Sequence, residues 1–323
     1  MKRIGIIGGS GYTAGELIRL LINHPQAGLD FVYSRTNPGK LVSSVHTDLT
    51  GQTELEFTDK VEKEVDVLFL CLGHGKSREF LEQHTVSDKT LLIDLSRDFR
   101  LKNEPGIQGR TFVYGLPEMN KEDIGNSTSI ANPGCFATAI QLALLPLATA
   151  GKLLDDVHVH AITGSTGAGV MPSSTTHFSW CNNNVSWYKP FVHQHETEII
   201  QSLEQCGASP KLRFLPIRGD FPRGIYATSY SSFSGTLEEA RQLYEEFYST
   251  SSFTKLTAEP IHLKQVVNTN YCHVHLHKHE DQLLVTSALD NLMKGASGQA
   301  IENMNLSLGF PQDMGLRIKA SVY

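Results

Sequence analysis

The amino-acid sequence predicts an α/β domain with a doubly wound parallel sheet, followed by an α+β domain with a mostly antiparallel sheet. In the first half of the chain, short apolar runs alternate with helical stretches, a rhythm typical of βαβ units. These runs are continuous, as expected for strands covered on both faces. After about residue 135 the runs lengthen and alternate polar with apolar residues, which favours antiparallel strands with one solvated face.

The first half supplies the parallel sheet and its first helix. Residues 3–7 form an apolar run that ends in glycines, and residues 15–23 carry apolar side chains at helical spacing. Further strands are predicted at residues 31–33, 65–72 and 91–95.

The second half supplies longer strands with helices between them. The predicted strands are residues 156–163, 212–217, 225–233 and 271–279, and the predicted helices are residues 196–206 and 237–248. A last helix at residues 298–308 is expected to return to the first domain. The expected domains are therefore residues 1–135 plus about 298–323, and about 136–297.

Composition narrows the classes of function. The chain has 323 residues, 40% of them hydrophobic and 19% charged, and its net charge of −6 argues against nucleic-acid and anionic-membrane partners. No apolar run reaches the roughly 20 residues that span a bilayer, and the first run is too short and glycine-broken for a signal peptide. We expect a cytoplasmic enzyme. Five scattered cysteines without Cys-x-x-Cys spacing predict neither disulfides nor a cysteine zinc site.

A glycine-rich loop follows the first strand and opens the first helix. Gly8 and Gly11 permit a tight turn and close approach of the backbone to a pyrophosphate, and the small Ala14 allows close packing of helix on strand. The strand–turn–helix context predicts a dinucleotide site rather than a glycine-rich turn without a ligand. The residues expected to line it are Gly8, Ser10, Gly11, Tyr12 and Thr13.

The end of the second strand indicates which dinucleotide is bound. An NAD site normally has an Asp or Glu there for the ribose 2′-hydroxyl, whereas this chain has Ser34 and Arg35. A hydroxyl and a guanidinium suit a 2′-phosphate, so we predict NADP(H). The alternative is that Arg35 is only a surface charge.

Cys135 is the candidate nucleophile. Pro133 and Gly134 form a sharp entry to the apolar helical stretch 139–147, which places Cys135 near a helix N-terminus. The helix dipole there stabilises a thiolate, and a thiolate attacks activated acyl groups to form a thioester. The alternative is a buried cysteine at the start of a core helix.

Two histidines in the segment 193–198 are candidate acid–base groups. His193 and His195 are two residues apart, and Glu198 is placed to orient an imidazole. Zinc ligation is not favoured, because a third ligand and the glutamate-flanked histidine pair of a protease helix are missing. A second array of histidines occupies one face of the strand 271–279. We interpret it as a solvated face of the sheet rather than as a metal site. Its members are His273, His275, His277 and His279.

Ordered motifs from residue 5 to about 305 resemble the N-acetyl-γ-glutamyl-phosphate reductases of arginine biosynthesis. Besides the glycine loop, they are Asp-Leu-Ser-x-Asp-Phe-Arg at 94–100, Ala-Asn-Pro-Gly-Cys at 131–135, Gly-Ser-Thr-Gly-Ala-Gly at 164–169, the histidine segment, Arg-Gly-Ile at 223–225 and Asp-Asn-Leu-x-Lys-Gly-Ala at 290–296. The resemblance implies the fold of aspartate-semialdehyde dehydrogenase: a Rossmann domain plus an α+β domain that carries the catalytic and oligomer contacts.

The resemblance also implies a reaction and roles for particular residues. It implies NADPH-dependent reduction of an N-acyl-γ-glutamyl phosphate to the semialdehyde by a homo-oligomer (dimer or tetramer), with Cys135 as nucleophile and His193 or His195 as proton carrier. Arg100 and Asn132 become phosphate-side candidates, and Arg223 a candidate for the substrate carboxylate. Ser165, Gly167 and Asn291 fall on segments near the nicotinamide.

The chain departs from the family pattern at several positions. Phe136-Ala137 replace Tyr-Pro after the cysteine, and Ala14 stands at the third loop glycine; neither change is expected to alter the chemistry. Arg97 replaces a small residue, and Gln194 and Thr197 replace Arg and Pro. The extra cation motivates a larger or more acidic acyl group, such as succinyl, beside acetyl. The rival interpretations are a reductase of aspartyl phosphate and a cofactor-binding regulator without turnover.

Overall fold

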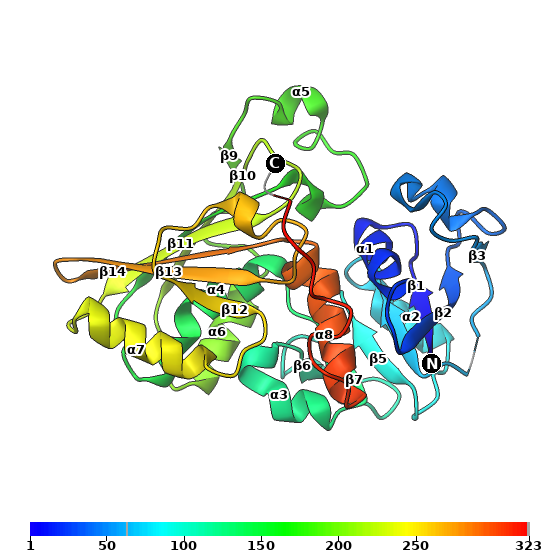
Figure 1. Ribbon diagram of the computed structural model, residues 1–323, viewed down its shortest axis with the longest axis horizontal. Coiled ribbons are helices and arrows are strands. Elements are labelled where there is room, and N and C mark those ends of the chain that lie inside the picture. Colours follow the sequence, from blue (N-terminus) through cyan, green and yellow to red (C-terminus); the bar gives the residue numbers. More distant parts are fainter. Residues whose placement is uncertain (63, 322–323) are drawn as a thin grey trace. The chain divides into compact units, whose positions relative to one another are not determined.

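The computed structural model describes residues 1–62 and 64–321, which divide into two compact units. Unit 1 contains Met1–Pro133 and Ala296–Arg317, and unit 2 contains Gly134–Gly295 and the C-terminal residues from Ile318. Figure 1 shows a sheet with flanking helices in each unit.

Unit 1 is built on a seven-stranded parallel sheet in the order β3-β2-β1-β4-β5-β7-β6. Its strands are β1 (Lys2–Ile7), β2 (Ala27–Tyr33), β3 (Phe57–Thr58), β4 (Val67–Leu70), β5 (Leu91–Asp94), β6 (Val113–Tyr114) and β7 (Ser129–Ala131). The chain winds outward from β1 in both directions, so β1 lies at the topological switch point where α/β sheets bind ligands. The predicted doubly wound sheet is confirmed.

The helices of unit 1 pack on this sheet because its strands are apolar on both faces. Every residue of β4 and β5 is buried, as the continuous apolar runs predicted. The helices are α1 (Tyr12–Leu21), α2 (Lys76–Gln83), α3 (Pro117–Gly125) and α8 (Gly298–Ser307), with 3₁₀ turns η1 (Val42–Ser44) and η2 (Thr47–Leu49) after β2. The C-terminal helix α8 contacts α1, α3 and β5, so it returns to this unit.

Unit 2 is built on a seven-stranded mixed sheet in the order β12-β13-β14-β11-β8-β10-β9, with only β8–β10 and β12–β13 parallel among the described pairs. Its strands are β8 (Val157–Thr163), β9 (Ser186–Trp187), β10 (Leu212–Arg218), β11 (Ile225–Ser232), β12 (Thr254–Thr257), β13 (Cys272–His279) and β14 (Gln282–Leu289). Its helical elements are α4 (Cys135–Thr149), η3 (Ser165–Ala168), α5 (Phe178–Cys181), α6 (Glu196–Gln205), α7 (Leu237–Tyr248), η4 (Leu263–Gln265) and the π-helical turn η5 (Met293–Ser297), which runs into unit 1. The predicted mostly antiparallel sheet is confirmed.

Helix α4 forms the core of unit 2. Residues 136–148 are all buried, and α4 contacts β11, β14, α6 and α7. Pro146 lies inside the helix and has no N–H for the carbonyl of Leu142. The hydroxyl of Tyr248 on α7 donates to that carbonyl instead, so the break in the hydrogen-bond ladder is repaired from a neighbouring helix.

The histidines of β13 lie on the sheet face opposite α4. The hydroxyl of Ser287 on β14 donates to Ala139 of α4, and Ser287 pairs with Val274, so alternate residues of β13 face away from α4. His277 and His279 are exposed, as predicted, whereas His273 and His275 are partly covered. None of the described residues forms a cluster of three or more groups suited to hold a metal ion. Nor does any helix of the described chain have the length and apolar character needed to cross a membrane.

Candidate active site

Cys135 is the first residue of α4, which confirms its predicted place at a helix N-terminus. The cap residue Gly134 has extended backbone (φ −71°, ψ 149°), and the first N–H groups of the helix have no partner within it. These N–H groups and the helix dipole favour a thiolate at this position. Gly295 packs against the cysteine, because a Cβ there would lie 2.8 Å from the Cβ of Cys135. Gly295 thus packs on the backbone and Cβ of Cys135, which remains partly exposed.

Glu198 on α6 holds the segment that presents the thiol. Its carboxylate is 2% exposed, and Oε2 accepts the Gly134 N–H at 3.0 Å. Gln141 of α4 donates to the backbone carbonyl of Glu198 and to Ser202, so α4 and α6 are joined at two further points. Oε1 lies 4.0 Å from Nε2 of His195. The carboxylate therefore faces both the cap of the nucleophile helix and an imidazole.

His195 lies beside the residue that precedes the thiol. A Cβ at Gly134 would lie 2.4 Å from Nε2 of His195, so only glycine leaves room for this ring. His195 is buried and immediately precedes α6, whose position is fixed through Glu198 and Gln141. The predicted thiol, imidazole and carboxylate are thus brought together within unit 2.

His193 is packed in an aromatic cage rather than against the cap residue. Its ring contacts Phe136, Tyr188, His195 and Phe214, and its Nδ1 accepts the backbone N–H of His195 at 3.2 Å. Nδ1 must therefore be the unprotonated nitrogen of the neutral ring. Burial, assisted by the charge of Lys189, lowers the pKa of His193 to about 4. His193 is neutral at physiological pH.

Tyr188 and Arg218 lie beside the histidine segment and were missed from the sequence. Burial, followed by the charge of Cys135, raises the pKa of Tyr188 well above its ordinary value. The guanidinium carbon of Arg218 lies 4.8 Å from the centre of the Tyr188 ring. The aromatic-rich segment 187–191 was the only available signal, and it does not specify which ring packs on the histidine segment.

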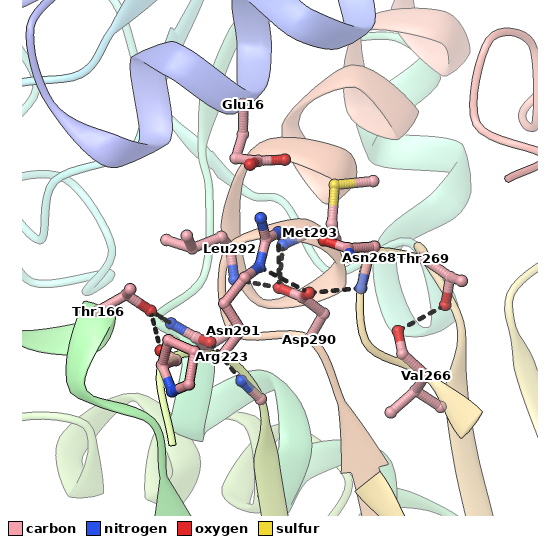
Figure 2. A network of polar contacts seen from close by, with 12 residues as sticks. Glu16, Thr166, Arg223, Val266, Asn268, Thr269, Asp290, Asn291, Leu292 and Met293 are labelled. Carbon is pink, nitrogen blue, oxygen red and sulfur yellow. Dashed lines mark hydrogen bonds and ion pairs between the residues drawn. The ribbon is translucent and has the colours of Figure 1, made fainter. Parts of the chain in front are cut away.

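A buried carboxylate fixes Arg223. Figure 2 shows the side chains of Arg223 and Asp290 directed toward one another. Nε and Nη2 of Arg223 donate to the two oxygens of Asp290 at 3.0 and 3.2 Å. Backbone N–H groups of Asn268, Leu292 and Met293 also donate to this carboxylate. Asp290 in turn accepts the Gly295 N–H through its backbone carbonyl, which links Arg223 to the glycine that packs on Cys135.

Asn291 joins the loop that contains Thr166 to the loop that contains Gly224. Its Nδ2 donates to Thr166 at 3.0 Å, and its Oδ1 accepts the Gly224 N–H at 2.6 Å (Figure 2). Ser165 and Gly167 belong to the same 3₁₀ turn as Thr166, and a Cβ at Gly167 would lie 4.0 Å from Nδ2 of Asn291. The three predicted residues Ser165, Gly167 and Asn291 are therefore neighbours.

The glycine loop of unit 1 has the geometry that a pyrophosphate requires. Gly8 has φ +85°, and a Cβ there would lie 2.5 Å from the carbonyl oxygen of Cys71, so no other residue fits. Gly11 caps α1, and a Cβ there would meet only the Gly8 carbonyl at 4.0 Å, which leaves the loop open to a ligand. The N–H groups of Tyr12 and Thr13 follow in the first turn of α1. These residues fit a dinucleotide.

Hydroxyl and amide groups gather at the C-terminal end of β2. The hydroxyls of Ser10 and Ser34 lie 2.9 Å apart, and Ser34 also contacts Thr36. Asn37 donates to Ser10 and Thr36, both at 3.1 Å. Arg35 is exposed. Lys76 is the main cause of the lowered pKa of Glu79, and the charge of Arg35 makes a smaller contribution. In the described part of the chain no carboxylate is hydrogen-bonded to these hydroxyls.

Most of the chain matches known protein families. A family model described as semialdehyde dehydrogenase, NAD binding domain, matches residues 3–127, and one described as semialdehyde dehydrogenase, dimerisation domain, matches residues 135–291. N-acetyl-γ-glutamyl-phosphate reductases from Christiangramia forsetii and Bacteroides thetaiotaomicron are 56% and 52% identical, each over all of both chains. The chain belongs to the N-acetyl-γ-glutamyl-phosphate reductase family.

Solved structures of other semialdehyde dehydrogenases have the same fold. The aspartate-semialdehyde dehydrogenase II of Vibrio cholerae aligns with a TM-score of 0.70 at 16% identity, over 96% of this chain and 99% of its own. The Candida albicans enzyme, solved with NADP, aligns with a TM-score of 0.71 at 14% identity, over 95% and 98%. At these identities the likeness shows the fold alone.

Within this reductase family member, Arg100 and Asn132 lie together in the interior of unit 1. Nε and Nη2 of Arg100 donate to the carbonyls of Asn132 and Leu95. The amide of Asn132 donates to Ala296 and accepts from Asn303. Arg100 is 5% exposed and Asn132 1%. The hydrogen bonds of Arg100 join the end of β5 to the end of β7.

The segment after β5 also carries the unusual Arg97. Arg97 is exposed, between the buried residues Ser96 and Asp98. Asp98 accepts the N–H groups of Gly75 and Arg78 at the start of α2. Arg97 therefore lies on a segment that is anchored on both sides, with its own side chain directed to the surface.

Proposed function

We propose that this family member reduces an N-acyl-γ-glutamyl phosphate to the N-acyl-glutamate semialdehyde through a thioester on Cys135, with NADPH as the reductant. The observation that carries the proposal is the constellation in unit 2, where Cys135 begins α4, Glu198 holds the cap residue and His195 packs against it. Nucleophilic acyl transfer requires a thiol, an imidazole and a carboxylate held close together. The junction of α4 and α6 supplies all three.

The first half-reaction is attack of the Cys135 sulfur on the acyl carbon. A C–S bond forms and the C–O bond to the phosphate breaks, so phosphate leaves and the thioester remains. The helix N-terminus stabilises the attacking thiolate, and its N–H groups are suited to the oxyanion of the tetrahedral intermediate. Arg223, held by Asp290, has the fixed planar guanidinium suited to a substrate carboxylate.

In the second half-reaction the thioester is reduced and the thiolate is released. NADPH, bound at the glycine loop, would supply the hydride for the thioester carbonyl. Collapse of the tetrahedral adduct breaks the C–S bond and returns the electron pair to Cys135. The N–H groups at the start of α4 again stabilise this thiolate, so the same helix terminus serves both half-reactions.

His195 is the proton carrier in this proposal: it takes the proton of the Cys135 thiol as the thiolate forms and gives it to the oxygen of the departing phosphate. Its Nε2 faces the cap of the nucleophile helix and Oε1 of Glu198, whereas His193 is held neutral in its aromatic cage. The pKa of His193, at about 4, is too low for proton exchange near neutrality. His193 instead orients His195 by accepting its backbone N–H.

NADP(H) is the proposed cofactor because of the end of β2. Ser34 is buried in a group of hydroxyls, and Arg35 supplies a cation where an NAD site normally has a carboxylate. The relatives' names give acetyl as the default acyl group. Succinyl is the second candidate, since exposed Arg97 adds a cation that a terminal carboxylate would match. Comparing kcat/KM for the two substrates decides between them, and an acetyl preference removes the succinyl candidate.

The proposed assembly is a homo-oligomer, dimer or tetramer, because residues 135–291 match a domain described as a dimerisation domain. Light scattering on the purified protein tests this, and a monomer would refute it.

The proposed reaction is tested in reverse with a panel of semialdehydes, phosphate and NADP. Turnover is expected with N-acyl-glutamate semialdehyde. A preference for aspartate semialdehyde would favour the aspartyl rival, and absence of any turnover would favour the non-catalytic one.

A further inference from the structure

The four residues after Thr36 form a rigid turn that carries a lysine with no assigned role. The N–H of Lys40 donates to the carbonyl of Asn37 at 3.1 Å, which closes the turn. Pro38 occupies its second position and Gly39, at φ +75°, its third, the residues that a type II turn requires. The local sequence therefore determines the conformation of this turn.

Strand β3 fixes the position of the turn. The N–H of Gly39 donates to the carbonyl of Phe57 at 2.8 Å, and the N–H of Phe57 donates to the carbonyl of Lys40 at 2.9 Å. The neighbouring N–H of Ser34 donates to Thr58 on the same strand. Because β3 pairs with β2, the backbone of Lys40 is tied to the strand end where a ribose would lie.

The side chain of Lys40 continues the polar group at the end of β2. Its Nζ donates to Oδ1 of Asn37 at 3.2 Å, and Nδ2 of Asn37 donates to the hydroxyls of Ser10 and Thr36. Ser10 belongs to the glycine loop itself. A continuous row of polar groups thus begins at the pyrophosphate loop: the hydroxyls of Ser10, Ser34 and Thr36, the amide of Asn37 and the ammonium of Lys40. Each of these groups can donate a hydrogen bond to a phosphate.

Arg35 and Lys40 differ in their electrostatic partners. The charge of Arg35 has only a small effect on Glu79 at the start of α2, because that carboxylate is paired with Lys76 at 2.6 Å. The hydrogen bond of Lys40 is to a neutral amide, which a phosphate oxygen can replace without separating an ion pair. Lys40 is exposed at its tip, so the exchange needs no rearrangement of the backbone.

We propose that Lys40, aimed by the Asn37–Lys40 turn, is the main cation that selects a dinucleotide with a 2′-phosphate. This inference rests on the proposed use of NADP(H) and assigns the selectivity to a residue of this chain. Lys40 acts as a point charge at the end of this row of polar groups.

The test measures binding rather than turnover. Its two probes each carry two phosphate groups, but only 2′,5′-ADP has one of them on the 2′ oxygen. Isothermal titration gives the Kd of 2′,5′-ADP and of 5′-ADP for wild type, Lys40→Met and Lys40→Arg. Lys89→Met is the matched control, because Lys89 is an exposed lysine two residues before β5, at the opposite, N-terminal edge of the parallel sheet.

Loss of one charge-assisted contact predicts that Lys40→Met weakens 2′,5′-ADP about tenfold. The same variant should change 5′-ADP by less than about twofold. Lys40→Arg should stay close to wild type, because the guanidinium keeps a positive charge that can bind a phosphate. Lys89→Met should leave both affinities unchanged.

The outcomes separate this inference from the proposed cofactor. If wild type prefers 2′,5′-ADP and Lys40→Met keeps that preference, Lys40 is not the selecting residue although the NADP proposal stands. If Lys40→Met weakens both probes equally, the lysine has a general effect on the loop and the inference is overturned. If wild type binds the two probes equally, the NADP preference fails and the role of Lys40 fails with it.

Discussion

The glycine loop of unit 1 and the thiol site of unit 2 are built in different ways. The loop owes its form to backbone geometry, since Gly8 alone can adopt φ +85° against the Cys71 carbonyl. The thiol site owes its form to buried charged side chains, in which Glu198 holds the cap of α4 and Asp290 holds Arg223. A ligand contacted mainly by backbone N–H groups requires small residues, whereas a reacting thiol requires oriented charges.

This difference makes the two sites separable by substitution. A change confined to the thiol site should remove acyl transfer and spare dinucleotide binding. A change confined to the glycine loop should weaken dinucleotide binding and spare the reactivity of the Cys135 thiol. The predictions below test that separation.

The largest effect is expected from Cys135→Ser. A serine hydroxyl is not ionised at a helix N-terminus, so acyl transfer should fall by at least about 1,000-fold, to background. NADPH binding, followed by nucleotide fluorescence, should remain within about twofold of wild type, since the loop lies in unit 1. Retained turnover by this variant contradicts the thioester mechanism.

Gly8→Ala should give the converse result. The new Cβ would lie 2.5 Å from a backbone oxygen and force a strained positive φ, which costs about 1–2 kcal/mol or more. We expect NADPH affinity to fall at least about tenfold. The rate of alkylation of Cys135 by iodoacetamide should be unchanged, and a large change in that rate would show that the sites are not separable.

The interior of unit 2 should also respond to pH through His193. Its pKa is about 4 in the folded protein and about 6.5 when unfolded, so below pH 6.5 only the unfolded chain gains this proton. Stability from this group is therefore complete above pH 6.5 and is lost as pH falls toward 4. At pH 4.5 the loss should be about 2 kcal/mol.

Urea unfolding of wild type and His193→Asn at pH 7.5 and 4.5 measures this contribution. Asparagine keeps an acceptor for the His195 N–H but does not titrate. The free energy of unfolding should therefore fall less in the variant than in wild type over this interval. An equal fall in both proteins would show that other groups determine the acid response.

How well the sequence predicts each site depends on how far apart its contacting residues lie along the chain. The glycine loop and the helix start at Cys135 are local patterns, so the sequence alone predicts both. The contact of Glu198 with Gly134 spans 64 residues, and Gly295 is still farther from Cys135 along the chain, so neither could be predicted from local patterns.

The strands show the same limit. Strand β2 begins at Ala27, four residues before the predicted strand, because residues 27–30 gain their conformation from pairing with β1. Strand β14 was not predicted, although it pairs with both β13 and β11 and lies within the sheet. Its extended conformation depends on two neighbours, one of them more than fifty residues away, and propensity alone does not supply that information.

The smallest effect is expected from Arg35→Met and concerns how selectivity is divided within unit 1. Arg35 is exposed, so screening by solvent limits its attraction for a phosphate. NADPH should weaken about threefold and NADH less, a smaller loss than for Lys40→Met. Equal losses for the two cofactors would place Arg35 away from the 2′-phosphate. A larger loss than for Lys40→Met would make the guanidinium, rather than the ammonium on its rigid turn, the main determinant of selectivity.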